Sequence, residues 1–238
     1  MDSLGPTRQD FLASSVSLAA IAGGGYAAPA QSRPGKSESE ALSRAVPFQF
    51  DRDTFRAVLE QPFPHRQLVA PTSFIAATVA MSHFTNSLTA YADPNGFAAG
   101  PKSLHCAGVL YAGYSYNMVL DDAMYAKYPI GLLNDEEMRP KDLSARAYWA
   151  ALRRNPMADF LRPLMEQGVS FFVCNNALTS LAVEIARRTA VNGAAVTRAR
   201  VVAIHDELAH HFLPGTMLVP AGVAAVNAAQ EARFTFLP

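Results

Sequence analysis

The sequence has few of the features that mark specialised classes of protein. It contains two cysteines in 238 residues, too few for the disulfide framework of small secreted domains. Basic and acidic residues number 20 each, and the resulting formal net charge of +0 argues against a nucleic-acid surface. Beyond the N-terminal residues, no window offers the roughly 20 uninterrupted apolar residues of a spanning helix. We therefore expect no membrane span in the mature chain.

Common cofactor and hydrolase motifs are missing as well. The sequence contains no Gly-x-Gly-x-x-Gly pattern, no phosphate-binding loop and no Gly-x-Ser-x-Gly pattern. Hydrophobic residues make up 50% of the chain, which favours an ordinary packed core. We therefore expect a globular protein that works without an organic cofactor.

Residues 1–30 have the pattern of an export signal peptide. Arg8 precedes a modestly apolar run rich in alanine, serine and glycine, which closes on Ala28-Pro29-Ala30 in the small-x-small form of a signal-peptidase site. The order Thr7-Arg8-Gln9-Asp10-Phe11-Leu12 resembles the twin-arginine export signal, with Gln9 in place of the second arginine. This pattern predicts export to a bacterial periplasm. The alternative interpretation is a disordered, alanine-rich tail.

Two short segments separate this signal from the main domain. Residues 31–46 are polar, contain Pro34 and Gly35, and are predicted to be a linker. Residues 47–64 are predicted to be a helical extension, capped by Asp51 or Asp53 and ended by prolines. The main domain is then expected to occupy residues 65–238.

Strand patterns alternate with helix patterns through this domain. We predict strands at 66–70, 104–111, 169–173, 217–219 and 234–237, and helices at 74–91, 116–127, 177–190, 197–212 and 221–232. Residues 128–141 are predicted to be irregular, followed by helical pieces from Asp142, through Trp149, to Gln167. Alternation of this kind predicts an α/β fold of three layers, in which helices cover both faces of a mainly parallel sheet of about five strands.

The clearest candidate for chemistry lies between Gly168 and Arg188. A strand of β-branched and aromatic residues runs into Cys174, Asn175 and Asn176, and a helix pattern follows. A thiol at the carboxyl end of a strand lies where α/β proteins bind ligands, and a helix amino terminus favours a thiolate. Cys174 is therefore the candidate catalytic residue, with the two asparagines as candidates for anion binding. The alternative is a small, buried, hydrophobic cysteine.

Other polar residues complete the list of candidates. The turn of Gly113, Tyr114 and Ser115 follows the second strand and is a candidate wall of the same site. Cys106 is expected to pack in the core, at a different level of the sheet from Cys174. His65 and Arg66 are candidates for binding an anion beside the sheet.

The run from His205 to His211 invites a metal interpretation. It lacks the His-x-x-x-His spacing that places two imidazoles on one helical face. We expect solvated helix pairs instead, Asp206 with His210 and Glu207 with His211, and no metal site.

Three segments resemble the DsrE-like sulfur-relay family. They are VCNNAL (173–178), LVPAGVAAVNAAQE (218–231) and AGVLYAGYSYNMVLDD (107–122). The whole chain is also similar to a group of exported bacterial DsrE-like proteins that carry the FFVCNNAL turn. The resemblance implies a flavodoxin-like fold, assembly into homotrimers or hexamers, and a persulfide on the cysteine at this turn, which Cys174 alone matches. Relay members are cytoplasmic, however, and many DsrE-like proteins have no demonstrated chemistry.

Two hypotheses follow from the sequence. In the first, the exported protein carries sulfur as a persulfide, or performs thiol redox chemistry, at Cys174, with a donor and an acceptor thiol as partners. In the second, it is a non-catalytic, oligomeric binding or scaffold protein with the same fold. The sequence leaves open whether the protein is an enzyme.

Overall fold

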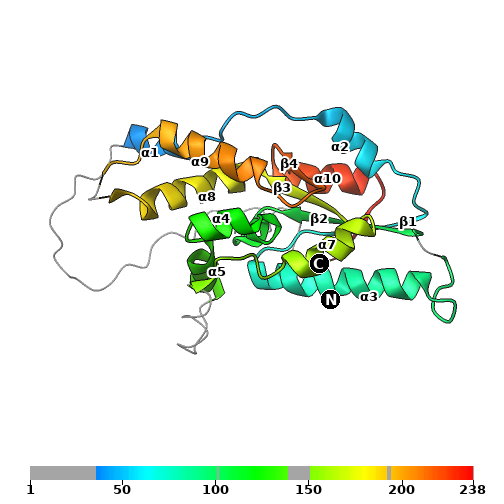
Figure 1. The fold of residues 1–238 in the computed structure, drawn as a ribbon. Coiled ribbons are helices and arrows are strands. Elements are labelled where there is room, and N and C mark those ends of the chain that lie inside the picture. Colours follow the sequence, from blue (N-terminus) through cyan, green and yellow to red (C-terminus); the bar gives the residue numbers. More distant parts are fainter. Residues whose placement is uncertain (1–35, 101, 139–150, 192–193, 238) are drawn as a thin grey trace, which may run out of the picture. The chain divides into compact units, whose positions relative to one another are not determined.

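The computed structural model describes residues 36–100, 102–138, 151–191 and 194–237. The predicted signal peptide and the predicted helix around Trp149 lie outside these residues. Five parallel strands form one sheet in the order β4-β3-β2-β1-β5 (Figure 1). Their bounds are β1 His65–Val69, β2 Leu104–Leu110, β3 Ser170–Cys174, β4 Thr216–Val219 and β5 Thr235–Leu237. The prediction of an α/β fold with a parallel sheet is confirmed.

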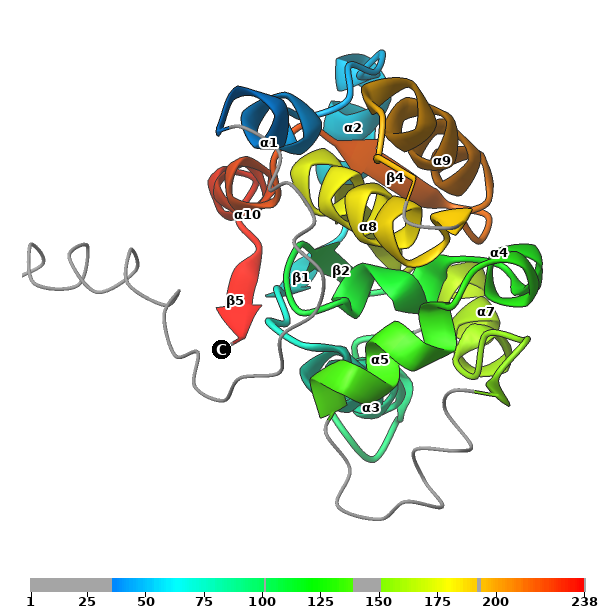
Figure 2. The ribbon, with the colours of Figure 1, turned by 90° about the vertical axis from the view of Figure 1, so that its left-hand side faces the viewer.

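Helices cover the sheet on both faces. Their bounds are α1 Lys36–Ser43, α2 Arg52–Leu59, α3 Phe74–Ala92, the 3-10 helix η1 Ser115–Val119, α4 Asp122–Lys127, α5 Ile130–Met138, α7 Ala158–Glu166, α8 Asn175–Arg188, α9 Arg198–His210 and α10 Gly222–Glu231. In Figure 1, α3 and α7 lie below the sheet, whereas α2 and α10 lie above it, and Figure 2 shows the same layers from the side. The three-layer arrangement matches the flavodoxin-like prediction.

Alternate residues of the central strands supply the two hydrophobic cores. Cys106 and Leu110 of β2 pack in the cluster that includes α3, α7, α8 and α9. Ala107 and Val109 of the same strand pack in the second cluster, with α2 and α10. Because successive side chains of a strand point to opposite faces, a strand buried along its whole length must be covered on both sides. All seven residues of β2 are buried.

Some helix ends follow directly from the predicted caps. Ser73 accepts a hydrogen bond from the Ala76 N–H at the start of α3, and Asp51 accepts one from Thr54 at the start of α2. Side chains of these types satisfy the otherwise unpaired N–H groups of a first helical turn. The caps confirm that the helical extension before β1 and the long helix after it begin where the sequence indicates.

Three local predictions were wrong. Helix α1 occupies much of the predicted linker, and its Leu42 is buried in the core. The helix expected at 116–127 is divided into η1 and α4, because Asp121 caps the Met124 N–H and so starts a new helix. The segment expected to be irregular after residue 128 contains α5, which begins directly after Pro129 and buries Ile130 completely.

The carboxyl ends of the three strands on one side of the sheet lie at the same level. Leu110 pairs with Val173 across β2 and β3, and Cys174 pairs with Val219 across β3 and β4. After β3 the chain enters α8, which packs in the first cluster, and after β4 it enters α10, which packs in the second. Ligands of open α/β sheets bind at carboxyl ends where neighbouring strands continue to opposite faces. Within the described ranges, no helix is long and apolar enough to cross a membrane.

Candidate functional site

Cys174 has the position that the sequence predicts, but it is covered. It is the last residue of β3 and the N-cap of α8, with extended backbone angles of φ −72° and ψ 122°. Its side chain makes no capping hydrogen bond, and the residue is 6% exposed. The thiol is free, as is that of Cys106. A reaction at Cys174 therefore requires neighbouring atoms to move.

The start of α10 provides that cover. A Cβ atom built at Gly222 would lie 2.4 Å from the Cβ of Tyr111 and 3.3 Å from the Cβ of Cys174. No side chain fits at 2.4 Å, so only glycine allows the helix to approach the sheet this closely. The place where the chain leaves β3 and β4 toward opposite faces is thus closed by helix packing.

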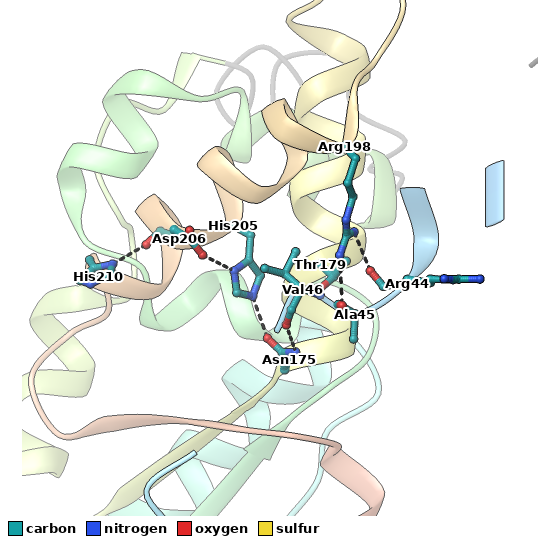
Figure 3. A network of polar contacts seen from close by, with 9 residues as sticks. All are labelled: Arg44, Ala45, Val46, Asn175, Thr179, Arg198, His205, Asp206 and His210. Atoms are coloured by element: carbon teal, nitrogen blue, oxygen red, sulfur yellow. Dashed lines mark hydrogen bonds and ion pairs between the residues drawn. The ribbon is translucent and has the colours of Figure 1, made fainter. Parts of the chain in front are cut away.

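Asn175 is held between two other parts of the chain (Figure 3). Its Nδ2 donates to the carbonyl oxygen of Val46 at 2.8 Å, and its Oδ1 lies 2.7 Å from Nε2 of His205. The Val46 N–H in turn donates to Oγ1 of Thr179, one turn further along α8, at 3.0 Å. The amide predicted to bind an anion is therefore already paired at both ends, while the neighbouring Asn176 is exposed.

Arg198 fixes the same N-terminal segment. Its guanidinium group donates to the carbonyl oxygens of Arg44 and Ala45, at 2.7 and 3.1 Å (Figure 3). It also donates to the carbonyl oxygen of Leu42, at 3.2 Å. Together with the bonds of Val46, these contacts hold residues 42–46 against α8 and α9. These five residues, predicted to belong to a linker, are thereby part of the folded domain.

His205 is the central residue of this network and is fully buried. Burial is the main cause that lowers its pKa below 6.5, so the imidazole is neutral at pH 7. Because the Asn175 amide nitrogen bonds to Val46, the Asn175 oxygen accepts, and Nε2 of His205 carries the proton. Nδ1 of His205 lies 3.1 Å from Oδ1 of Asp206, and this contact acts against the effect of burial on the pKa. The Asp206 side chain is exposed.

The expected solvated pairs of this run were wrong. His210 bonds to the backbone oxygen of Asp206, at 2.6 Å. Glu207 bonds to Lys127 and to the hydroxyl of Tyr128, and the Lys127 bond is the main cause that lowers its pKa. No group of three or more His, Cys, Asp or Glu side chains in the described part of the chain could hold a metal ion.

The turn of Gly113, Tyr114 and Ser115 lies at the same edge of the sheet as Cys174. Gly113 and Tyr114 have left-handed backbone angles, with φ of 49° and 54°, which turn the chain sharply from β2 into η1. Ser115 is completely buried, and its hydroxyl has no hydrogen-bond partner among the described residues. The pairing of Leu110 with Val173 brings this turn and the start of α8 to one level.

The prediction for Cys106 is confirmed. It is buried in the core, where its thiol lies 3.5 Å from Oε1 of Gln67. Burial raises the pKa of this thiol to about 12, so it stays protonated and unreactive near neutral pH.

A groove between α2 and α10 is a cavity that sequence reasoning missed. Its volume is about 660 Å³. Six of the apolar residues that line it are Phe50, Phe55, Leu59, Ala224, Ala225 and Ala228. Its charged lining residues are Arg52, Arg56, Glu60, Arg66, Glu231 and Arg233. The groove lies over the second hydrophobic cluster, and its lining includes Val219, the last residue of β4, and Pro220.

The two walls of the groove are fixed by an aromatic pair and an arginine. The ring of Phe55 packs edge-on against Phe172 of β3, with centroids 5.0 Å apart, and thereby holds α2 on the sheet. Arg66 donates to the carbonyl oxygen of Ala232, after α10, and to that of Gln61, after α2, at 2.8 Å in the second case. This residue, predicted to bind an anion, instead joins the ends of the two helices.

The sequence did contain a signal for the groove. Ala221, Ala225, Ala228 and Ala232 recur at intervals of four, three and four residues, which places them on one face of α10. Small side chains along one face leave space between neighbouring helices, whereas larger ones fill it. The position of α2 opposite this face depends on long-range packing, which the sequence pattern does not contain.

Comparison of the chain with protein-family models, with curated proteins and with solved structures found no match. Its function must therefore be inferred from its own residues and their geometry.

Proposed function

We propose that this protein binds a small molecule without covalent chemistry, in the groove between α2 and α10. The groove itself is the observation that supports this role most directly. Its volume of about 660 Å³ falls within the range of roughly 300–1,000 Å³ that is typical of small-molecule sites. Its lining is mainly apolar, with a few charged groups at the rim, and this is the usual composition of such sites.

The alanine face of α10 keeps the groove open. Ala224 is exposed and Ala228 is half-buried, so neither side chain is covered by α2. Burial of their methyl groups by a ligand contributes about 25 cal/mol per Å² of apolar surface. Phe50 and Phe55 on the opposite wall offer aromatic surface to the same ligand, with their ring centroids 5.6 Å apart.

A neutral, environment-sensitive dye tests the proposal. Nile red should bind to the full chain and gain fluorescence, and Ala228→Phe should fill the groove and weaken this binding at least tenfold. Val223→Phe is the matched control, because Val223 is on the same helix but 63% exposed and outside the groove lining. Equal dye binding by the wild type and Ala228→Phe, with both proteins folded, would count against the groove as a binding site.

Sulfur transfer at Cys174 is the second candidate function. It is favoured by the position of the thiol at the carboxyl end of a central strand and at the first turn of α8. In this reaction the Cys174 thiolate attacks the outer sulfur of a donor persulfide, whose S–S bond breaks and whose inner sulfur leaves as a thiolate. An acceptor thiolate then removes the sulfur from Cys174 in the same way, without net oxidation.

Mass spectrometry distinguishes the two candidates. After incubation with a low-molecular-weight persulfide, sulfur transfer predicts a gain of one sulfur atom in the wild type and in Cys106→Ser, and none in Cys174→Ser. An unmodified wild type that still binds Nile red would support the binding function alone.

Export and oligomerisation remain part of the proposal. The signal-like residues 1–30 support a periplasmic location, and the DsrE-like resemblance supports a homotrimer or hexamer. N-terminal sequencing of protein from the periplasmic fraction tests the first, since cleavage should leave Gln31 at the new amino terminus. Light scattering on the purified protein tests the second.

A further inference from the structure

We propose that the ligand of the α2–α10 groove is an amphiphilic anion, namely a carboxylate attached to an apolar chain or ring. This inference rests on the proposed function and specifies its ligand. The apolar lining described above fits the chain or ring, and the distribution of charge at the rim selects the head group.

The rim of the groove is positively charged although the chain as a whole is neutral. Four arginines and two glutamates line it, an excess of two positive charges in a protein whose formal net charge is +0. One glutamate is already engaged, because Oε1 of Glu60 lies 3.7 Å from Nε of Arg56, one helical turn away. The local charge therefore favours an anion over a cation.

Two of the arginines are available for a head group. Arg66 is occupied with the carbonyl oxygens of Gln61 and Ala232. Arg52 and Arg233 are exposed, and neither has a side-chain hydrogen bond or ion pair with any described residue. A guanidinium group presents a planar set of N–H donors that matches a carboxylate and bonds to it in a bidentate manner. A carboxylate at the rim thus finds donors that no group in the described part of the chain uses.

The backbone adds positive character where Pro220 and Ala221 line the groove. Ala221 is the N-cap of the ten-residue helix α10 and has no side-chain oxygen to cap it. The first N–H groups of this helix therefore lack a side-chain partner, and they carry the partial positive charge of a helix amino terminus. No acidic residue lies in the first turn of α10 to neutralise that charge.

Three ligands with one tail test the charge preference. Calorimetric titration of the full chain with octanoate, 1-octanol and octylammonium compares an anionic, a neutral and a cationic head group. Octanoate should bind about tenfold more tightly than 1-octanol, a difference of about 1.4 kcal/mol, because hydrogen bonds to a charged group are stronger than those to a neutral one. Octylammonium should bind most weakly. Higher salt should weaken octanoate binding and leave 1-octanol binding unchanged.

Charge-neutralising variants locate the head group. The double variant Arg52→Gln, Arg233→Gln should lose about tenfold in octanoate affinity and keep its affinity for 1-octanol. The matched control is Arg162→Gln, Lys102→Gln, which removes the same charge from exposed positions outside the groove lining and should bind octanoate like the wild type.

Each outcome has one meaning. Equal affinity for the three ligands, or an equal loss in the control variant, would overturn the anionic ligand while leaving an apolar binding site intact. Failure of all three ligands and of Nile red to bind would overturn the proposed function as well.

Discussion

Nε2 of His205 and Oδ1 of Asn175 lie 2.7 Å apart, and both side chains are closed to solvent, at 0% and 3% exposure. This bond joins α9 to the residue that directly follows Cys174. It also orients the Asn175 amide toward Val46, so a single side chain connects three segments that are distant in the sequence.

Asn175→Ala is therefore expected to destabilise the fold. It would leave the Nε2–H of His205 and the carbonyl oxygen of Val46 buried without partners, at a cost of about 3 kcal/mol in unfolding free energy. Urea denaturation measures the loss. Asn176→Ala, at the exposed neighbouring position, should change the unfolding free energy by less than about 0.5 kcal/mol. Similar midpoints for the two variants would mean that the network adds little stability.

His105 should make the stability depend on pH. Burial is the main cause that lowers its pKa from 6.5 to about 4, and the charge of Arg66 adds to the effect. Between pH 6.5 and 4 the unfolded chain therefore binds a proton that the folded chain does not. The stability from this group is complete above pH 6.5, is lost as the pH falls toward 4, and does not decline further below it.

The loss from His105 is on the order of 2 kcal/mol at pH 5, from about 1.4 kcal/mol per unit of pH. Urea midpoints measured between pH 7.5 and 5 give the dependence of stability on pH, and His105→Gln should remove the contribution of His105 to it. His205 contributes a slope of the same sign, so the quantity to compare is the difference between the wild type and the variant. Parallel curves for the two proteins would contradict the assignment.

Gly222→Ala should disturb the contact of α10 with the sheet. The new methyl carbon would lie 2.4 Å from the Cβ of Tyr111, and overpacking of this kind costs about 1–3 kcal/mol. Tyr111→Gly would remove the atom that it meets, so the double variant should be less destabilised than the sum of the single variants. Val223→Ala, at the exposed next position, serves as the control. Additive effects on the unfolding free energy would show that the clash is relieved in another way.

Arg233→Gly should stabilise the protein and impair its binding. Arg233 follows α10 with a left-handed backbone, at φ 67°, where glycine avoids the steric cost that other residues meet. We expect the unfolding free energy, measured by thermal denaturation, to rise by up to about 1 kcal/mol, and octanoate to bind more weakly. Gln230→Gly, within the last turn of the same helix, should instead lower the unfolding free energy by about 0.5–1 kcal/mol. A destabilised Arg233→Gly variant would mean that the side chain has a structural role.

Local patterns predicted the fold well where one pattern dominated. The buried runs around Val109 and Phe172 and the caps at Asp51 and Ser73 led to the correct strands and helices, because these signals are contained in a few neighbouring residues. Helix α5 was missed because its charged residues and flanking prolines concealed the buried Ile130 and Leu133.

The site was harder to predict than the fold. The position of Cys174 at the end of β3 followed from the sequence, but its cover by Gly222 depends on the placement of α10, which lies 48 residues further along the chain in a different layer. His205 belongs to the buried face of α9 with Val201 and Leu208, so the polar run around it was misleading. One partner of Asn175, Val46, came from the segment that composition alone had marked as a linker.

Helix α10 is shared by two features of the molecule: its alanine face is one wall of the groove, and Gly222 at its start covers Cys174. A ligand that binds the groove only when α10 is docked must therefore oppose every motion that uncovers the thiol. By thermodynamic linkage the effect is reciprocal, so modification of Cys174 would weaken the binding of the ligand by the same free energy. One helix thus makes occupancy of the groove and exposure of the cysteine competing states of a single equilibrium.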